Sequence, residues 1–137
     1  MTRDRVADVD AFLIAMDCPP HARPAVLALR DHIATCGPAR WRGRDASKFW
    51  SLTAAVGGHV ICDVTLWKPT PEVYVTLRDT EPGRGARAIL TYHFSEARKP
   101  VLLDSLDAAT ALCPRLTQAY ALALARPYGA APPPASA

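Results

Sequence analysis

Between residues 49 and 94 the chain alternates apolar and polar residues, and this alternation predicts four β-strands. Each strand keeps its apolar residues on one parity, so one sheet face is core and the other carries mainly Ser, Thr, Asp, Tyr, Arg and His. The predicted strands cover residues 49–56, 60–66, 72–78 and 86–94. The residues expected to face inward are Trp50, Leu52, Val60, Val64, Leu66, Val73, Val75, Leu90, Tyr92 and Phe94.

The glycines between the first two strands constrain their register. A two-residue loop of Gly57 and Gly58 would pair Val56 with His59 and place even-numbered residues beside odd-numbered ones. Because both strands bury even positions, we expect a three-residue loop that includes His59, with a glycine in the left-handed conformation.

Helical spacing of apolar residues predicts helices over residues 8–16, 22–35 and 106–126. Pro114 should kink the last of these helices or divide it in two. Residues 40–48 are interpreted as a basic connector. The predicted fold class is therefore α+β: a single antiparallel sheet of about four strands, with N-terminal and C-terminal helices packed on one face. One domain is expected over residues 1–126, followed by a disordered Pro/Ala-rich tail at 127–137.

Composition sets limits on the function. The chain has 137 residues, of which 50% are hydrophobic and 21% charged, with a net charge of +3, values typical of a globular domain with a mild preference for anionic partners. It has no apolar run long enough to cross a bilayer and no signal segment, so we expect a cytoplasmic protein without a membrane partner. Its four cysteines form no close pair, so reduced thiols are expected, with no metal and no cofactor.

The polar face of the predicted sheet is the first candidate site. If neighbouring strands pair in sequence order, Thr53 faces Asp63, Asp63 faces Thr76, and Tyr74 lies between Thr65 and Thr91. Arg78 would face Arg87, an unfavourable pair that an acidic ligand, or Glu81 as a counter-ion, would relieve. A solvated face with no ligand has the same composition. The candidate ligand-binding residues are Asp63, Tyr74, Arg78, Arg87 and His93.

The basic segment is the second candidate. Its cations would bind phosphates while an exposed tryptophan stacks on a base, which predicts a nucleic-acid or phosphate-binding protein. The alternative is a solvated connector with Trp41 and Trp50 tucked into the core. The candidate residues are Arg40, Trp41, Arg42, Arg44 and Lys48.

No catalytic motif is present. The chain has no G-x-S-x-G, no P-loop and no G-x-G-x-x-G, and its histidines lack ligand-like spacing. The leading hypothesis is a small non-catalytic binding domain for an unknown small molecule or protein. A small enzyme that uses His93 with Asp63 or Tyr74 is an alternative, and so is a homodimer formed through the sheet face or an edge.

Two stretches carry a family resemblance. V-D-A-F-L at residues 9–13, followed by A-V-L-A-L-R-D-H-I at 25–33 and L-T-Y-H-F at 90–94, resembles the small bacterial YdhG-like domains of unknown function. The resemblance covers most of residues 8–126 and implies a frataxin-like fold. Some relatives are thought to carry iron through acidic residues around the first helix. No matching motif transfers a metal site to the acidic residues found there, which are Asp4, Asp8, Asp10 and Asp17.

Overall fold

Six antiparallel strands form one sheet whose spatial order follows the chain, β1-β2-β3-β4-β5-β6. The computed structural model describes residues 4–79 and 99–125, and within them it places three helices beside this sheet. The strands are β1 (Asp4–Val6), β2 (Arg40–Asp45), β3 (Phe49–Val56), β4 (His59–Trp67), β5 (Glu72–Leu77) and β6 (Val101–Leu102). The helices are α1 (Val9–Ala15), α2 (Arg23–Cys36) and α4 (Leu106–Ala125).

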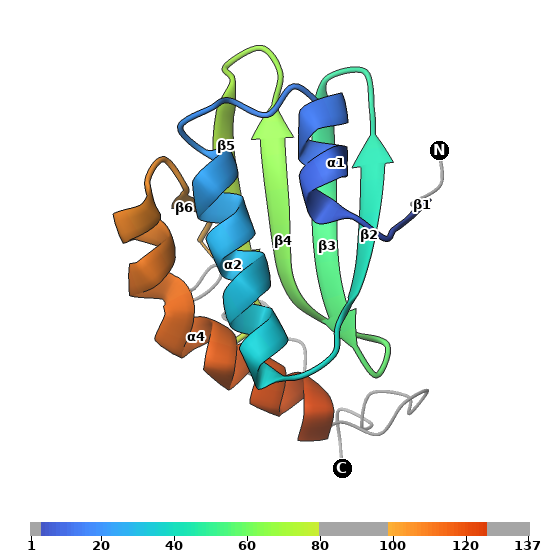
Figure 1. Ribbon diagram of the computed structural model, residues 1–137, viewed down its shortest axis with the longest axis vertical. Helices are drawn as coiled ribbons and strands as arrows, with labels where there is room; N and C mark the ends of the chain where they lie inside the picture. Colours follow the sequence, from blue (N-terminus) through green and yellow to red (C-terminus); the bar gives the residue numbers. More distant parts are fainter. Residues whose placement is uncertain (1–3, 80–98, 126–137) are drawn as a thin grey trace, which may run out of the picture.

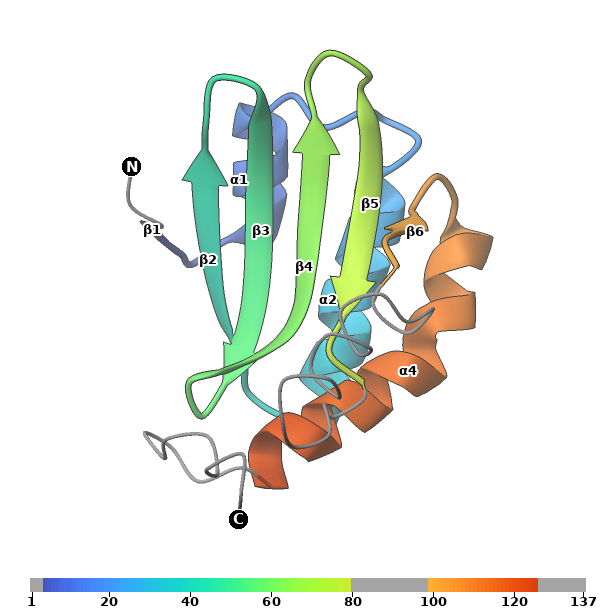
Figure 2. The same ribbon diagram turned by 180° about the vertical axis from the view of Figure 1, so that it is seen from behind.

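The helices α1 and α2 lie over the same face of the sheet, α1 across β2 and β3 and α2 across β4 and β5 (Figure 1). The helix α4 packs along α2 and also contacts β3, β4 and β5. Seen from behind, β2, β3 and β4 lie in front of α1 and α2 (Figure 2). The face of these strands that is turned away from the two helices is called the outer face below.

Local sequence signals explain where the helices begin and end. Asp8 caps α1 by accepting a hydrogen bond of 3.1 Å from the Ala11 amide, and Ser105 caps α4 by accepting one of 3.1 Å from the Ala108 amide. The helix α2 ends before Gly37, whose φ of 151° suits only glycine. The three predicted helices are therefore confirmed to within two residues, but α4 continues through Pro114 and is not divided there.

The inner face of the sheet carries the core. Its central strands bury Trp50, Leu52, Val64 and Val75 completely, as their parity predicted, and α2 and α4 cover them with side chains that include Leu29. The helices also bury Ile33, Leu112 and Leu116 fully or almost fully.

The interpretation of residues 40–48 as a connector was wrong. Residues 40–45 form β2, which pairs with β1 on one side and with β3 on the other. Trp41 and Gly43 face the core, while Arg40 and Arg42 are exposed. Position 43 faces the core without an apolar side chain of its own. The ring of Phe12 fills the space where a side chain at this position would lie. The strand therefore alternates, but with one large apolar residue only.

The far edge of the sheet also differs from the prediction. Tyr74 pairs with Leu102 of β6, and Val75 with Val101, so the expected pairing of Tyr74 with Thr91 was wrong. The sheet has six strands instead of about four because β1, β2 and β6 were not predicted. The predicted strand at 86–94, including Arg87 and His93, and the predicted tail at 127–137 lie outside the described residues.

The turn between β3 and β4 has two residues, not three. Gly57 and Gly58 have φ angles of 58° and 80°, and Val56 pairs with His59. The extra residue that parity requires is Ile61, inserted as a β-bulge and fully buried. As a result Val60 pairs with Ala55 on the outer face, so the prediction that it faces inward was wrong. Beyond the bulge the predicted cross-strand partners are confirmed, namely Thr53 with Asp63, Asp63 with Thr76, and Thr65 with Tyr74.

The buried thiols give a first testable prediction. Burial raises the pKa of Cys62 from its ordinary 9.0 to about 12, and that of Cys18 to about 11. At pH 8 we expect iodoacetamide to label Cys62 about 1,000-fold more slowly in the folded protein than in urea, because so little thiolate is present. Peptide mass spectrometry against time measures both rates. Equal rates would show that Cys62 is not buried.

Candidate functional site

The strand register arranges the outer face in cross-strand rows. One row places Arg40 beside Ala55 and Val60, at the end of the sheet near the Gly57-Gly58 turn. The next row runs from Arg5 through Arg42, Thr53 and Asp63 to Thr76. A third row consists of Arg44, Ser51, Thr65, Tyr74 and Leu102.

The first two rows border a hollow of about 720 Å³ between the start of β2 and the turn that joins β3 to β4. Four strands and two connections contribute to it, so it depends on the folded sheet and not on any one segment of the sequence. The residues that line it are Arg5, Pro38, Ala39, Arg40, Arg42, Thr53, Ala55, Val56, Gly57, Gly58 and Val60.

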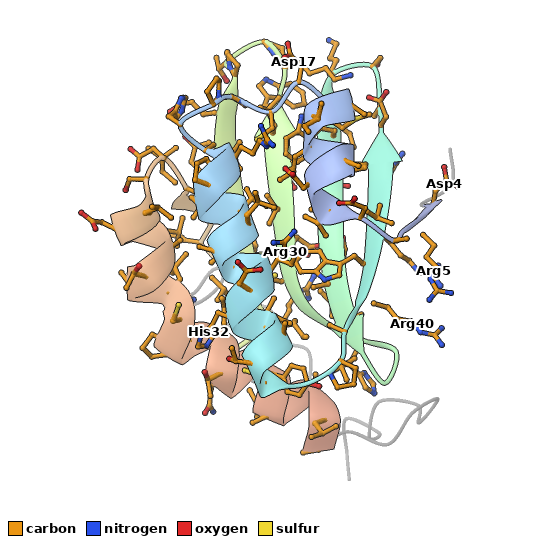
Figure 3. The ribbon with its side chains drawn as sticks, viewed as in Figure 1. Asp4, Arg5, Asp17, Arg30, His32 and Arg40 are labelled. Carbon is orange, nitrogen blue, oxygen red and sulfur yellow. The ribbon has the colours of Figure 1, made fainter. Side chains whose placement is uncertain are left out.

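Three arginines line this hollow. Arg5, Arg40 and Arg42 are all exposed, and none of them forms an ion pair with another residue in the parts of the chain that the structure describes. Figure 3 shows the side chains of Arg5 and Arg40 extending on the same side of the molecule, from β1 and from the start of β2. Like charges held close together repel, so an anion bound among them is stabilised.

Asp63 is the acidic residue in the second row, and it is already engaged. Its Oδ1 accepts a hydrogen bond of 2.8 Å from Thr53 Oγ1, and its Oδ2 lies 3.6 Å from Arg78 Nη2. The two predicted residues Asp63 and Arg78 are thus brought together, and Asp63 supplies the counter-ion that Arg78 was expected to need. Because this carboxylate is shared with Arg78, it does not neutralise Arg42.

Tyr74, another member of the predicted sheet-face site, does not line the hollow. Tyr74 is half-buried in the third row, across the sheet from Arg5 and Arg42. Arg87 and His93 lie outside the described residues. The proposed pairing of His93 with Asp63 or Tyr74 for acid–base chemistry therefore stays a prediction.

The predicted basic segment is split between the two ends of the sheet. Arg40 and Arg42 line the hollow, whereas the Arg44 guanidinium lies 5.4 Å from the centre of the Phe49 ring, a cation–π distance. Lys48 follows the far end of β2, which spans roughly 16 Å from its first residue to its last at about 3.3 Å per residue. The five candidate residues therefore do not form one site.

Stacking on Trp41 is contradicted by its position. Trp41 is 9% exposed and Trp50 is fully buried, so neither offers a face to a nucleic-acid base. Trp67 is 45% exposed, but it ends β4 opposite Phe49, at the other end of the strand from Val60. Along β4, Trp67 lies seven steps of about 3.3 Å, or roughly 23 Å, from Val60 in the row of Arg40, and four steps, or roughly 13 Å, from Asp63 in the row of Arg42.

Arg5 is the functional candidate that sequence reasoning missed. It precedes α1 in the chain, in a segment for which no strand was predicted. Pairing of β1 with β2 places it directly opposite Arg42. The run Arg3-Asp4-Arg5-Val6 contains a single apolar residue, so it has no alternation from which a strand could be predicted.

A second polar cluster joins α2 to α4. His32 Nε2 lies 2.8 Å from Thr117 Oγ1, and that hydroxyl donates a hydrogen bond of 3.2 Å to the Cys113 carbonyl. Because the hydroxyl proton is used in this way, the histidine nitrogen is the donor to Thr117. The cluster therefore links the two packed helices α2 and α4.

Two of the acidic residues near α1, Asp8 and Asp10, have structural partners. Asp8 caps the helix, and Asp10 accepts a hydrogen bond of 2.7 Å from Arg23 that lowers the pKa of its carboxyl group. Within residues 4–79 and 99–125 no group of three His, Cys, Asp or Glu side chains is arranged to hold a metal ion. The observed contacts of Asp8 and Asp10 are those of a cap and a surface ion pair.

Comparison with protein-family models, with curated proteins and with solved structures finds no match to the chain. The resemblance to YdhG-like domains therefore stays a prediction. Across the described ranges, no helix combines the length and the apolar character needed to span a bilayer.

Proposed function

We propose that this chain is a small non-catalytic binding domain that holds an anionic ligand in the arginine-lined hollow of its outer sheet face. One observation carries the proposal: Arg5, Arg40 and Arg42 border the same hollow, and no acidic side chain among the described residues pairs with them. Guanidinium groups form strong, often bidentate hydrogen bonds with carboxylates and phosphates, so such a ligand satisfies all three charges at once.

The proposal joins two hypotheses drawn from the sequence. The polar sheet face was expected to bind a small ligand, and the basic segment was expected to bind phosphate. In the fold, Arg40 and Arg42 of the basic segment lie on the polar face itself.

Binding is favoured over catalysis because of what lines the hollow. Its described lining contains arginine, threonine and small apolar or glycine residues, with no carboxylate, imidazole or thiol. Thr53 is the one hydroxyl there, and it donates its proton to Asp63. General acid–base or nucleophilic catalysis needs a group that this lining does not supply.

Calorimetric titration with pyrophosphate tests the proposal. We expect the double variant Arg40→Gln/Arg42→Gln to lose about 100-fold or more in affinity, because each charge-assisted hydrogen bond contributes about 1.5–3 kcal/mol. The matched control is Arg30→Gln/Lys48→Gln, which removes the same charge from α2 and from the far end of the β2–β3 hairpin. This control should bind like the unaltered protein.

Two results would contradict the proposal. Pyrophosphate, acetate and phenyl phosphate could all fail to bind the unaltered protein. Alternatively, the two double variants could lose affinity equally, which would show a response to net charge and not to a site. Circular dichroism spectra establish that each variant is folded before it is titrated.

A further inference from the structure

We infer that the ligand is an organic anion whose acidic group is joined to an apolar body, and not a bare inorganic ion. The inference rests on the proposed function and names the class of ligand. Its observation is the contrast between the two rows that border the hollow, one carrying Arg5, Arg42 and Thr53 and the other carrying Arg40 beside Ala55 and Val60.

The apolar side chains at this end of the sheet depart from the polar middle of the outer face. In the middle of β3 and β4 the outer positions are the polar residues Ser51, Thr53, Asp63 and Thr65, while Phe49 and Trp67 lie at the far end of the sheet. Val60 breaks this pattern because the bulge at Ile61 shifts the parity of the strand, which turns Val60 outward and buries Ile61 in its place. An outward valine next to a hollow offers apolar area that a ligand can cover.

The apolar surface continues around the hollow. Ala39 and Pro38 border it from the connection that follows α2, and Val56 borders it at the end of β3. The hollow of about 720 Å³ has the size of sites that hold organic ligands, of which a single phosphate ion would fill a small part. A ligand that fills this space therefore has an apolar body as well as an acidic group.

The two rows also indicate how the ligand is oriented in the hollow. Arg5 and Arg42 lie opposite each other in one row, so the acidic group is placed between them, with Arg40 alongside. The body then lies over Ala55 and Val60 and points toward the Gly57-Gly58 turn. A Cβ built at Gly57 would meet nothing within 4 Å, so that end of the hollow is open to a longer body.

Matched pairs of probes test the inference by calorimetry. Phenyl phosphate is compared with inorganic phosphate, and octanoate with acetate, so that each pair differs only by the apolar body and the two pairs distinguish phosphate from carboxylate ligands. We expect at least one probe with an apolar body to bind tenfold or more tightly than its partner. Phenol and octanol serve as bodies without a charge and should not bind measurably.

The variant Val60→Thr tests whether the apolar body of the ligand lies over Val60. It keeps the branched shape of the side chain but replaces one methyl group by a hydroxyl, so it should reduce the affinity for the favoured probe three- to tenfold and leave that for its small partner unchanged. The double variant Arg40→Gln/Arg42→Gln should lose both.

The outcomes separate this inference from the proposed function. If both members of each pair bind equally and the arginine variant loses them, the inference fails and the proposed function stands. If the larger probe binds more tightly but Val60→Thr does not weaken it, the body lies elsewhere and the inference again fails. If no probe binds, the proposed function fails too.

Discussion

Replacement of Trp41 by alanine is expected to lower the free energy of unfolding by about 3–5 kcal/mol, the usual range for removing a large aromatic side chain from a core. Trp41 is 9% exposed and is the one large apolar residue of β2 on the inner face. Its loss opens a cavity beneath the strand that carries Arg40 and Arg42. Urea unfolding followed by circular dichroism measures the change.

The variant Trp41→Phe separates the core role from a binding role. Phenylalanine keeps an aromatic ring on the inner face, so the fold should persist and the affinity for pyrophosphate should stay within about twofold of the unaltered value, since the ring does not reach the hollow. If the Trp41→Phe protein is folded but loses tenfold or more in affinity for pyrophosphate or a short oligonucleotide, Trp41 belongs to the binding site. That result would support the nucleic-acid hypothesis.

Alternation predicted those strands whose inner positions are all apolar. The strands β3 and β5 match their predictions at one end or both because their inner positions are apolar, with Trp50, Leu52 and Ala54 in β3 and Val73, Val75 and Leu77 in β5. In β2 the pattern fails at Gly43, where the missing side chain is replaced by Phe12, which comes from α1. The packing of Phe12 against Gly43 is a tertiary contact. The residues around β2 in the sequence therefore give no sign of it.

The bulge was partly predictable. Parity correctly required one extra residue between β3 and β4, but a loop and a bulge supply it equally well. The local signal was the run Val60-Ile61-Cys62, in which three consecutive apolar residues interrupt the alternation. Two adjacent glycines, moreover, suit a two-residue turn with positive φ at both positions, which is what the structure has.

The sequence predicted the kind of chemistry found at the candidate site, but it did not predict which residues form the site. The sequence indicated both a polar sheet face and a basic segment, and Arg40 and Arg42 belong to both. It did not bring Arg5 to them, because a three-residue strand has too little pattern to predict a partner. It also placed Val60 in the core, so the apolar side of the hollow was not visible before the register was known.

Replacement of Gly43 by alanine is expected to cost about 1–3 kcal/mol of unfolding free energy, the range for overpacking a filled core. A Cβ built at this position would lie 2.8 Å from Cζ of Phe12 and closer still to Cε2. The ring has little room to move, because it packs edge-on against Trp50 with centroids 5.9 Å apart. Urea unfolding followed by circular dichroism measures the change without relying on the fluorescence of Trp50, which the Phe12 ring contacts.

A double-mutant cycle with Phe12→Ala identifies the clash as the cause. Phe12→Ala has a cost of its own, but in its presence Gly43→Ala should become nearly neutral, giving a coupling energy of about 1–2 kcal/mol. Gly57→Ala is the matched control: its Cβ meets nothing, and its cost of about 1 kcal/mol comes from a φ of 58°. Phe12→Ala should leave that cost unchanged. If Gly43→Ala is equally harmful with and without the Phe12 ring, the glycine is needed for its backbone, and the packing of α1 on β2 is not what requires it.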